Sequence, residues 1–326
     1  MGDAEVRILF LVHPYPNYVP DLLLHGLRHL LGTGVVEYPR KACLYEGVIG
    51  LGVCPQELLH PGWFPADDGI GREEIPARLR GGWFDYVLCD VRSLNEVVTL
   101  LEGARVKGVG VIDGEDQPIP MRPGPFLLFR RETDGGDAAV PLPMALPQEV
   151  FDTIRALDGE AKRYPIGFAG AVSDASPERA RLIEALREEV PEGFYAVTGV
   201  PDGEGGEPAG RLSRREYYRA MQQCRLTLTL PGAGLDTFRF WEHAACRAPQ
   251  MVRRMPLYIP DDFVEGRHLY RFDGVDQMLR LLDSALRDED RLEEMAALQR
   301  AHLQRHHLTI HRAIWCIDKM REAFGG

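Results

Sequence analysis

Residues 224–250 have the sequence CRLTLTLPGAGLDTFRFWEHAACRAPQ. The apolar and β-branched run from Leu226 to Leu230 predicts a buried strand. A proline and two glycines within residues 231–234 predict a tight turn. Asp236 or Thr237 is then a suitable cap for the helix that follows. The succession of strand, glycine turn and helix predicts an α/β unit.

The same segment has the features of an anion-binding site. Free N–H groups at a helix start and the helix dipole are directed at the same spot. Arg239 would lie near the phosphates of a bound nucleotide, and Glu242, one turn later, could bind a ribose diol. The alternative is an ordinary strand-to-helix connection in which Arg239 pairs with a neighbouring acid. Both interpretations stay open, because short motifs often match by chance.

The rest of the chain repeats the alternation of strands and helices. Further strands are predicted at 6–12, 35–38, 84–89, 109–112, 126–129, 166–169, 194–198 and 251–252. Further helices are predicted at 20–31, 93–102, 176–189, 213–223, 275–286, 289–306 and 309–324. Irregular segments are predicted at 42–71 and 199–210, which are rich in glycine and proline. This order predicts two Rossmann-like halves.

Composition narrows the class of protein. A chain of 326 residues is long enough for two domains, and its net charge of −11 argues against a nucleic-acid partner. Its six cysteines form no C-x-x-C pair, which indicates reduced structural thiols and a cytoplasmic protein. We expect no transmembrane segment and no signal peptide, and peripheral membrane contact stays open.

The central segment resembles the donor-binding helix of GT-B glycosyltransferases, especially the bacterial exostosin-like and CgeB-like group. The motif of that group is approximately G-x-G-x-D-T-x-R-x-x-E-x-x-A-x-x-x-x-P. It is matched by Gly232, Gly234, Asp236, Thr237, Arg239, Glu242, Ala245 and Pro249. Many GT-B enzymes carry two glutamates eight positions apart. Here Glu242 matches the second, and Gly234 occupies the place of the first.

The resemblance implies two Rossmann-like α/β domains facing a cleft. An N-terminal acceptor domain is expected over 1–145 and a nucleotide-sugar domain over 146–306, with a closing helix over 307–326 that packs back on the N-terminal domain. Weaker landmarks of the same group lie at 113–116, 130–132, 141–143, 168–170, 179, 265–269 and 306–309. The first hundred residues match only in the order of strands and helices.

A nucleotide-diphosphate sugar would bind the C-terminal domain in this interpretation. The growing charge of the departing diphosphate needs arginine or lysine and backbone N–H groups. The expected donor-binding residues are Gly170, Gly232, Gly234, Asp236, Thr237, Arg239 and Glu242. Arg179 is interpreted as a solvated helix residue.

An inverting transfer also needs a general base for the acceptor hydroxyl. His13 is suitable by its ordinary pKa and by its place after the first strand, although it could merely shape that loop. Asp90 and Asp113 are competing catalytic residues, because they too follow strands, and Glu115 and Asp116 share that position.

The sequence contains two candidate metal sites. Asp113-Gly114-Glu115 resembles the carboxylate pair that holds Mg²⁺ or Mn²⁺ in GT-A glycosyltransferases, but the second set of strand–helix units favours metal-independent catalysis. Four histidines, at 302, 306, 307 and 311, include pairs four apart that could hold zinc. A solvated basic helix end explains them better. We expect no metal and no cofactor, with the nucleotide sugar as substrate.

These observations predict a cytoplasmic hexosyltransferase-like enzyme that moves a sugar from a nucleotide-diphosphate donor to an acceptor, which is a glycan, a small molecule or a protein. The rival enzyme is a sugar-nucleotide epimerase or phosphorylase on the same scaffold. The non-enzyme rival is a nucleotide- or carbohydrate-binding protein without turnover, which the missing first glutamate suggests.

Overall fold

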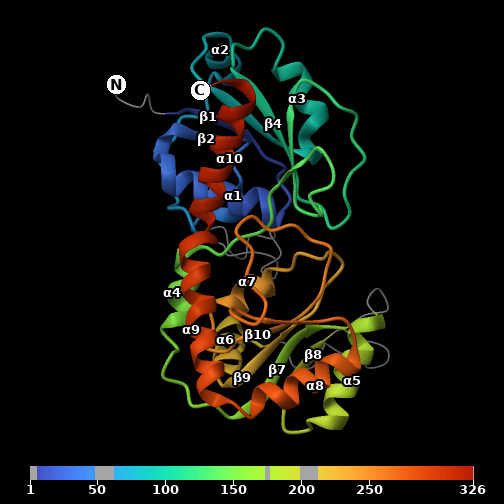
Figure 1. Cartoon of the computed structure of the whole chain (residues 1–326). Coiled ribbons are helices and arrows are strands. Elements are labelled where there is room, and N and C mark those ends of the chain that lie inside the picture. Colours follow the sequence, from blue (N-terminus) through green and yellow to red (C-terminus); the bar gives the residue numbers. More distant parts are fainter. Residues whose placement is uncertain (1–5, 48–61, 173–176, 199–211, 326) are drawn as a thin grey trace, which may run out of the picture. The chain divides into compact units, whose positions relative to one another are not determined.

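The computed structural model describes residues 6–47, 62–172, 177–198 and 212–325. The chain forms two α/β units (Figure 1). Unit 1 comprises residues 1–147, 257–260 and 308–326, and unit 2 comprises residues 148–256 and 261–307. The predicted irregular segment 199–210 lies outside the described residues, as does much of 42–71.

Unit 1 contains a six-stranded parallel sheet with the order β2-β1-β3-β4-β5-β6. Its strands are β1 (Ile8–Leu11), β2 (Val35–Tyr38), β3 (Tyr86–Asp90), β4 (Gly108–Asp113), β5 (Leu127–Arg130) and β6 (Val140–Pro141). Both faces of β1 and β3 are buried, which explains their near-continuous apolar sequences.

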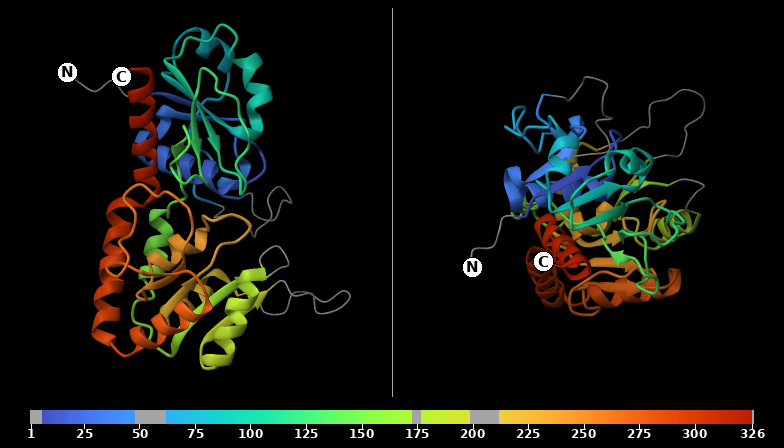
Figure 2. Two further views of the ribbon diagram at one scale, coloured as in Figure 1. Left: turned by 45° about the vertical axis from the view of Figure 1, so that its right-hand side comes forward. Right: turned by 90° about the horizontal axis from the view of Figure 1, so that it is seen from above.

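Helices cover both faces of this sheet. Its helices are α1 (Tyr18–Leu31), α2 (Ile75–Arg80), α3 (Leu94–Leu100) and α10 (Thr309–Phe324). Leu9 and Val87 pack with Leu79 of α2 on one face. The opposite face carries α1 and α10, which lie against each other and against β4 (Figures 1 and 2). The last helix therefore belongs to the N-terminal unit.

Unit 2 contains a five-stranded parallel sheet with the order β11-β10-β9-β7-β8. Its strands are β7 (Tyr164–Ala171), β8 (Phe194–Thr198), β9 (Cys224–Thr229), β10 (Gln250–Arg253) and β11 (Tyr270–Phe272). Its helices are α4 (Gln148–Arg155), α5 (Pro177–Glu189), α6 (Arg214–Gln222), α7 (Phe238–Ala244), α8 (Val275–Leu286) and α9 (Glu289–His306).

The alternating leucines and threonines of β9 divide between two faces of this sheet. Leu226 and Leu228 pack in the apolar core formed with α5 and α8. Thr229 is buried on the other face, where its Oγ1 lies 2.9 Å from Nδ1 of His243 on α7 and donates to Oε1 of Gln250 at 2.7 Å. The strand predicted from residues 226–230 is thus a central strand with one apolar and one polar face.

Several local predictions are confirmed. Ser213 and Glu216 form the predicted capping box, with Ser213 Oγ accepting from the Glu216 N–H and Glu216 Oε2 accepting from the Ser213 N–H. The five described cysteines are buried free thiols. Within the described residues, every helix is too short or too polar to cross a bilayer. The sequence patterns do not predict α2, α4, β6 or β11, which are short elements.

Candidate active site

Both sheets share one topology. In each unit the second strand pairs with one side of the first strand, and the third strand pairs with its opposite side, as in β2-β1-β3 and β8-β7-β9. Ligands of such open sheets bind at the carboxyl ends of the strands, where the order reverses. That point lies between β1 and β3 in unit 1 and between β7 and β9 in unit 2. The residues predicted from the sequence concentrate at these two edges.

Arg239, in the first turn of α7, lies at the carboxyl ends of the strands of unit 2. Its Nε donates to the carbonyl oxygen of Ala169 in β7 at 2.8 Å, and its guanidinium lies 5.1 Å from the ring centroid of Phe168. A Cβ added to Gly170 would be 2.2 Å from the guanidinium of Arg239. Glycine at 170 therefore makes room for the arginine against the end of β7.

Arg179 lies at the same edge, so its interpretation as a solvated helix residue is wrong. It is only 7% exposed. Its NH1 donates to the carbonyl of Ala171 at 2.5 Å, and its NH2 donates to the carbonyls of Leu230 and Pro231. The side chain reaches these carbonyls because α5 begins beside the ends of β7 and β9, a proximity that helical periodicity does not reveal.

The two arginines are close enough for the charge of Arg239 to act on Arg179. Among the residues that the structure describes, neither guanidinium has a carboxylate within ion-pair distance. Burial and the neighbouring charge of Arg239 lower the pKa of Arg179 to about 10, so it remains charged at neutral pH. Two partly desolvated cations held on carbonyl oxygens form a site complementary to a multivalent anion.

The glycine turn before α7 is held by its own polar groups. The N–H of Gly232 donates to the carbonyl of Gly234 at 2.8 Å, so it is occupied. Asp236 is buried, and its Oδ1 accepts from Nε1 of Trp241 at 2.9 Å. Thr237 is the N-cap residue, but its side chain makes no capping bond. Because α7 has only seven residues, arginines rather than the helix dipole supply most of the positive charge here.

Glu242 is partly buried on the next turn of α7. Its Oε1 accepts from the hydroxyl of Tyr218 on α6 at 2.8 Å. Burial raises the pKa of Glu242, while the Tyr218 hydrogen bond and the charges of Arg214 and Arg239 oppose that shift. The hydroxyl of Tyr218 thus orients the side chain of Glu242 through its Oε1 atom.

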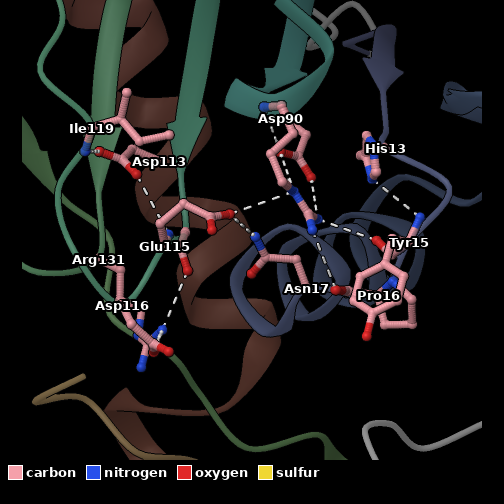
Figure 3. Close-up of polar contacts among 12 residues, drawn as sticks. His13, Tyr15, Pro16, Asn17, Asp90, Asp113, Glu115, Asp116, Ile119 and Arg131 are labelled. Atoms are coloured by element: carbon pink, nitrogen blue, oxygen red, sulfur yellow. Dashed lines mark hydrogen bonds and ion pairs between the residues drawn. The ribbon is translucent and has the colours of Figure 1, made fainter. Parts of the chain in front are cut away.

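At the edge of unit 1, His13 follows β1 in a short loop (Figure 3). Its Nδ1 accepts from the N–H of Tyr15 at 3.2 Å. A neutral imidazole that accepts at Nδ1 carries its hydrogen on Nε2. In this arrangement Nε2 of His13 is a hydrogen-bond donor.

Asp90 is the last residue of β3 and is fully buried. Its Oδ1 accepts from the backbone N–H and from Nε of Arg92, and its Oδ2 accepts from NH2 of Arg92 at 2.9 Å. Arg92 also donates to the carbonyl of Tyr15. Asp90 thereby positions an arginine that holds the loop after β1.

Asp113, at the end of β4, is likewise buried. Its Oδ2 accepts from the N–H of Ile119 at 2.9 Å and from Nε of Arg130 at 3.2 Å. Glu115 is more accessible; its Oε1 accepts from Nδ2 of Asn17 at 2.9 Å (Figure 3). Asp116 pairs with NH1 of Arg131 at 2.7 Å.

Part of the chain matches a known protein family, and the whole fold matches solved structures. Residues 179–317 match a family model described as glycosyl transferase-like. HepE from Anabaena, solved with UDP-glucose, is 11% identical and matches with a TM-score of 0.57 over 97% of this chain and 99% of its own. A glycosyltransferase from Rickettsia africae ESF-5 is 10% identical and matches with a TM-score of 0.62 over 98% and 99%.

An α-glucosyltransferase solved with UDP-glucose and DNA is 8% identical, with a TM-score of 0.53 over 97% of this chain and 98% of its own. A search of curated protein sequences found no match. The agreement over two parallel-sheet domains decides the architecture. The fold is GT-B.

The GT-B fold agrees with the preference for two Rossmann-like halves over a GT-A arrangement. It also identifies the signal that sequence reasoning missed at Arg179. In a GT-B C-terminal domain the helix after the first strand starts at the ligand-binding edge, so a basic residue in its first turn was a candidate. Predicting its burial, however, requires knowing that β9 lies beside β7.

The histidines near the end of α9 form an aromatic cluster, not a solvated helix end. The Nε2 atoms of His302 and His307 lie 2.6 and 3.0 Å from the carbonyl oxygen of Asp261. His302 stacks on His268 at 4.5 Å, and His307 stacks on Phe263 at 4.9 Å between ring centroids. His311 belongs to unit 1. Hydrogen bonding and stacking account for the buried members of this cluster.

Proposed function

We propose that this protein transfers a hexose from a nucleotide-diphosphate donor to an acceptor hydroxyl. The observation that carries the proposal is a pair of arginines, Arg179 and Arg239, at the β7–β9 edge of a GT-B fold. Both are held by carbonyl oxygens, and within the described part of the chain neither forms an ion pair with a carboxylate. A diphosphate supplies the negative charge that this pair needs, and guanidinium forks match phosphate oxygens. HepE, which has the same fold, was solved with UDP-glucose, which supports a nucleotide sugar as the donor.

The chemistry proposed for this edge is leaving-group stabilisation. The acceptor oxygen bonds to the anomeric carbon as the bond between that carbon and the phosphate oxygen breaks. Negative charge grows on the departing diphosphate, which takes up the proton that the acceptor hydroxyl releases. Arg179 and Arg239 are already held by carbonyl oxygens, so little reorganisation is needed at that moment. Because two fixed cations meet the developing charge, we propose that transfer is metal-independent.

The remaining donor residues have distinct proposed roles. Glu242, oriented by Tyr218, binds the ribose hydroxyls. Gly170 and Gly232 keep the backbone clear beside the two guanidiniums, since an added Cβ would lie 2.2 Å from Arg239 and 3.4 Å from Arg179, respectively. Gly234, Asp236 and Thr237 shape the turn into α7, with Asp236 acting through its bond to the Trp241 indole.

In unit 1, His13 is the residue we propose to contact the reacting hydroxyl. Asp90 and Asp113 are buried and engaged with Arg92 and Arg130, so we propose that they position the surrounding loops.

We also propose that the chain belongs to the exostosin-like or CgeB-like group, because its residues 232–249 match the motif of that group. We propose a cytoplasmic location, because its described thiols are reduced.

The test compares Arg239→Ala with Arg219→Ala. Arg219 is a matched control, because its pair with Glu160 is half-exposed and lies on α6, away from the edge. Thermal unfolding is measured with UDP, GDP, TDP, CMP and ADP conjugates. A conjugate at 100 times its Kd should stabilise the wild type and the control by about 2.7 kcal/mol. It should barely stabilise Arg239→Ala.

Transfer or donor hydrolysis should fall about 100-fold or more in Arg239→Ala, as when one charge-stabilising donor is removed. Equal stabilisation of both variants by the same conjugate would remove the site assignment. Binding without turnover across an acceptor panel would favour the nucleotide-binding alternative, which Gly234 in place of the first glutamate suggests. An altered sugar nucleotide formed without acceptor would favour the epimerase.

A further inference from the structure

The loop after β1 holds an exposed aromatic ring on a fixed backbone. Residues 13–17 are His-Pro-Tyr-Pro-Asn, and Tyr15 is 53% exposed. The prolines have no N–H. The N–H of Tyr15 donates to His13, and the N–H of Asn17 donates to Oδ2 of Asp21 at 2.9 Å. Every backbone donor from residue 14 to residue 17 is therefore either absent or bonded.

The carbonyl groups of the loop are held by two cations from elsewhere in unit 1. Nζ of Lys41 donates to the carbonyls of His13 and Tyr15 at 2.6 and 2.8 Å, and Arg92 donates to the Tyr15 carbonyl at 3.2 Å. Lys41 is fully buried and pairs with the equally buried Asp21 at 2.9 Å. Burying an ion pair is costly, so its use to fix this loop indicates that the loop's geometry matters.

A second exposed tyrosine lies on the neighbouring strand. Tyr38 ends β2 and is 41% exposed. The carbonyl of Tyr38 accepts from the N–H of Val12 at 3.0 Å, directly before His13. Single exposed aromatic residues are common on protein surfaces. Here two exposed tyrosines lie at the carboxyl ends of adjacent strands, beside a hydrogen-bonded loop. Open sheets bind ligands at this edge, so the arrangement is more specific than a single exposed ring.

His13 adds a directional polar group to this arrangement. Its Nδ1 is occupied by the Tyr15 N–H, so in the neutral ring Nε2 carries the hydrogen and is a donor. A flat apolar ring with a fixed hydrogen-bond donor next to it matches a pyranose, which has an apolar face of C–H groups and a rim of hydroxyls. Because the backbone that carries both groups is fixed before binding, less entropy is lost when a weak, hydrated ligand binds.

We propose that Tyr15, with His13 and Tyr38 beside it, forms a platform for a sugar ring of the acceptor. The acceptor of this protein is then a glycoside, whose ring stacks on Tyr15 while a hydroxyl accepts from Nε2 of His13. This inference rests on the proposed glycosyl transfer and goes further by naming the acceptor class. All three residues belong to unit 1, so binding at this platform can be measured apart from that of the donor.

The experiment measures binding of methyl α- and β-glycosides of glucose, galactose, mannose and N-acetylglucosamine by saturation-transfer NMR, with and without UDP. At least one glycoside should bind the wild type, with its C–H face receiving the strongest saturation. Tyr15→Ala should raise its Kd tenfold or more, Tyr15→Phe should stay within threefold, and Tyr38→Ala should have a smaller effect. Leu30→Ala, at an exposed apolar position on α1, is the matched control and should bind normally.

Three results would overturn the platform: no glycoside binding to the wild type, unchanged binding by Tyr15→Ala, or displacement of the glycoside by a donor sugar nucleotide but not by UDP. The last result would assign the ring to the donor's sugar. Thermal unfolding of each variant checks that folding is intact. UDP binding should be unaffected in Tyr15→Ala and weakened in Arg239→Ala, so failure of the platform and failure of the proposed function give different patterns.

Discussion

At the scale of single residues, the unit 2 edge depends on two cations that no described carboxylate pairs with. A buried arginine usually has a carboxylate partner, because burial without one is costly. Arg179 instead uses three carbonyl oxygens and Arg239 uses one, and both lie near the ring of Phe168. Partial negative charges of carbonyls stabilise the guanidiniums without neutralising them, which leaves their full charge for a ligand.

His13 carries a prediction about proton position. Glutamine at this position can place an amide donor near the site of Nε2, whereas asparagine can replace only the Nδ1 acceptor that bonds the Tyr15 N–H. If His13 donates to substrate, His13→Gln should keep kcat/KM within about fivefold and His13→Asn should lower it about tenfold or more, the cost of a lost hydrogen bond. Steady-state kinetics with a donor and a glycoside acceptor measure both.

A general base gives the opposite pattern. The kcat/KM of both variants would then be about 100- to 10,000-fold lower, and neither variant would show the fall in kcat/KM at acid pH that the wild type shows. That result would mean that the Nδ1 bond breaks in the substrate complex.

At the scale of elements, α10 is joined to α1 by close backbone contact. A Cβ added to Gly26 of α1 would lie 2.1 Å from the carbonyl oxygen of Thr309, and Nδ1 of His25 lies 2.9 Å from Oγ1 of Thr309. The carbonyl of Pro141 also accepts from the indole of Trp315 at 3.0 Å. These contacts explain why the final helix belongs to unit 1 although it directly follows α9.

Gly26→Ala should therefore destabilise unit 1. The added methyl group cannot fit unless α10 moves, and overpacking of this kind costs about 1–3 kcal/mol. Urea unfolding, followed by the near-UV signal of the tryptophans, measures the change. Gly159→Ala is the control, because its Cβ would meet nothing within 4 Å. A stability loss no larger than the control's would show that α10 does not pack this tightly on α1.

At the scale of the whole molecule, the two units share one topology, and each buries titratable groups whose pKa values are shifted by that burial. Burial, followed by the charges of His302, Arg267 and His306, lowers the pKa of His268 in unit 2 to about 4. Burial also lowers the pKa of His302 and of His243. In unit 1, burial raises the pKa of Asp21 to about 6 against the pull of Lys41.

These shifts have opposite signs. Between about pH 6.5 and pH 4 unfolded His268 binds more protons than folded His268, so its contribution to the stability of unit 2 is lost as the pH falls, by up to about 1.4 kcal/mol per pH unit. The lowered pKa values of His302 and His243 act in the same direction, and the raised pKa of Glu242 opposes them. Folded Asp21 binds its proton more tightly than unfolded Asp21 between about pH 6 and pH 4, so its contribution to the stability of unit 1 increases as the pH falls.

Mild acid should therefore unfold unit 2 first. Hydrogen exchange followed by mass spectrometry at pH 7.5 and pH 5 should show earlier loss of protection in β9 and α9 than in β1 and α1. His268→Asn, which can keep an acceptor for the Val264 N–H, should flatten the pH dependence of unit 2. Simultaneous unfolding of both units with an unchanged slope in this variant would contradict the assignment.

The amino-acid sequence by itself determined the order of strands and helices, the glycine turn before α7 and the capping box of α6, because these depend on periodicity and on neighbours within a few residues. Likewise, the motif at 232–249 selected Arg239, whose side chain bonds the end of β7. Short elements such as α2 and β11 carry too few residues for a periodic signal.

Only the tertiary structure decided which charged residues are available for chemistry. Arg179 reaches the carbonyl of Pro231, 52 residues away, and Arg239 reaches that of Ala169, 70 residues away. The structure likewise engages Asp90 with Arg92 and Asp113 with Arg130, and sets the tautomer of His13. The physical reason is that burial and ion pairing depend on which strands are neighbours in the sheet, and no local pattern encodes that.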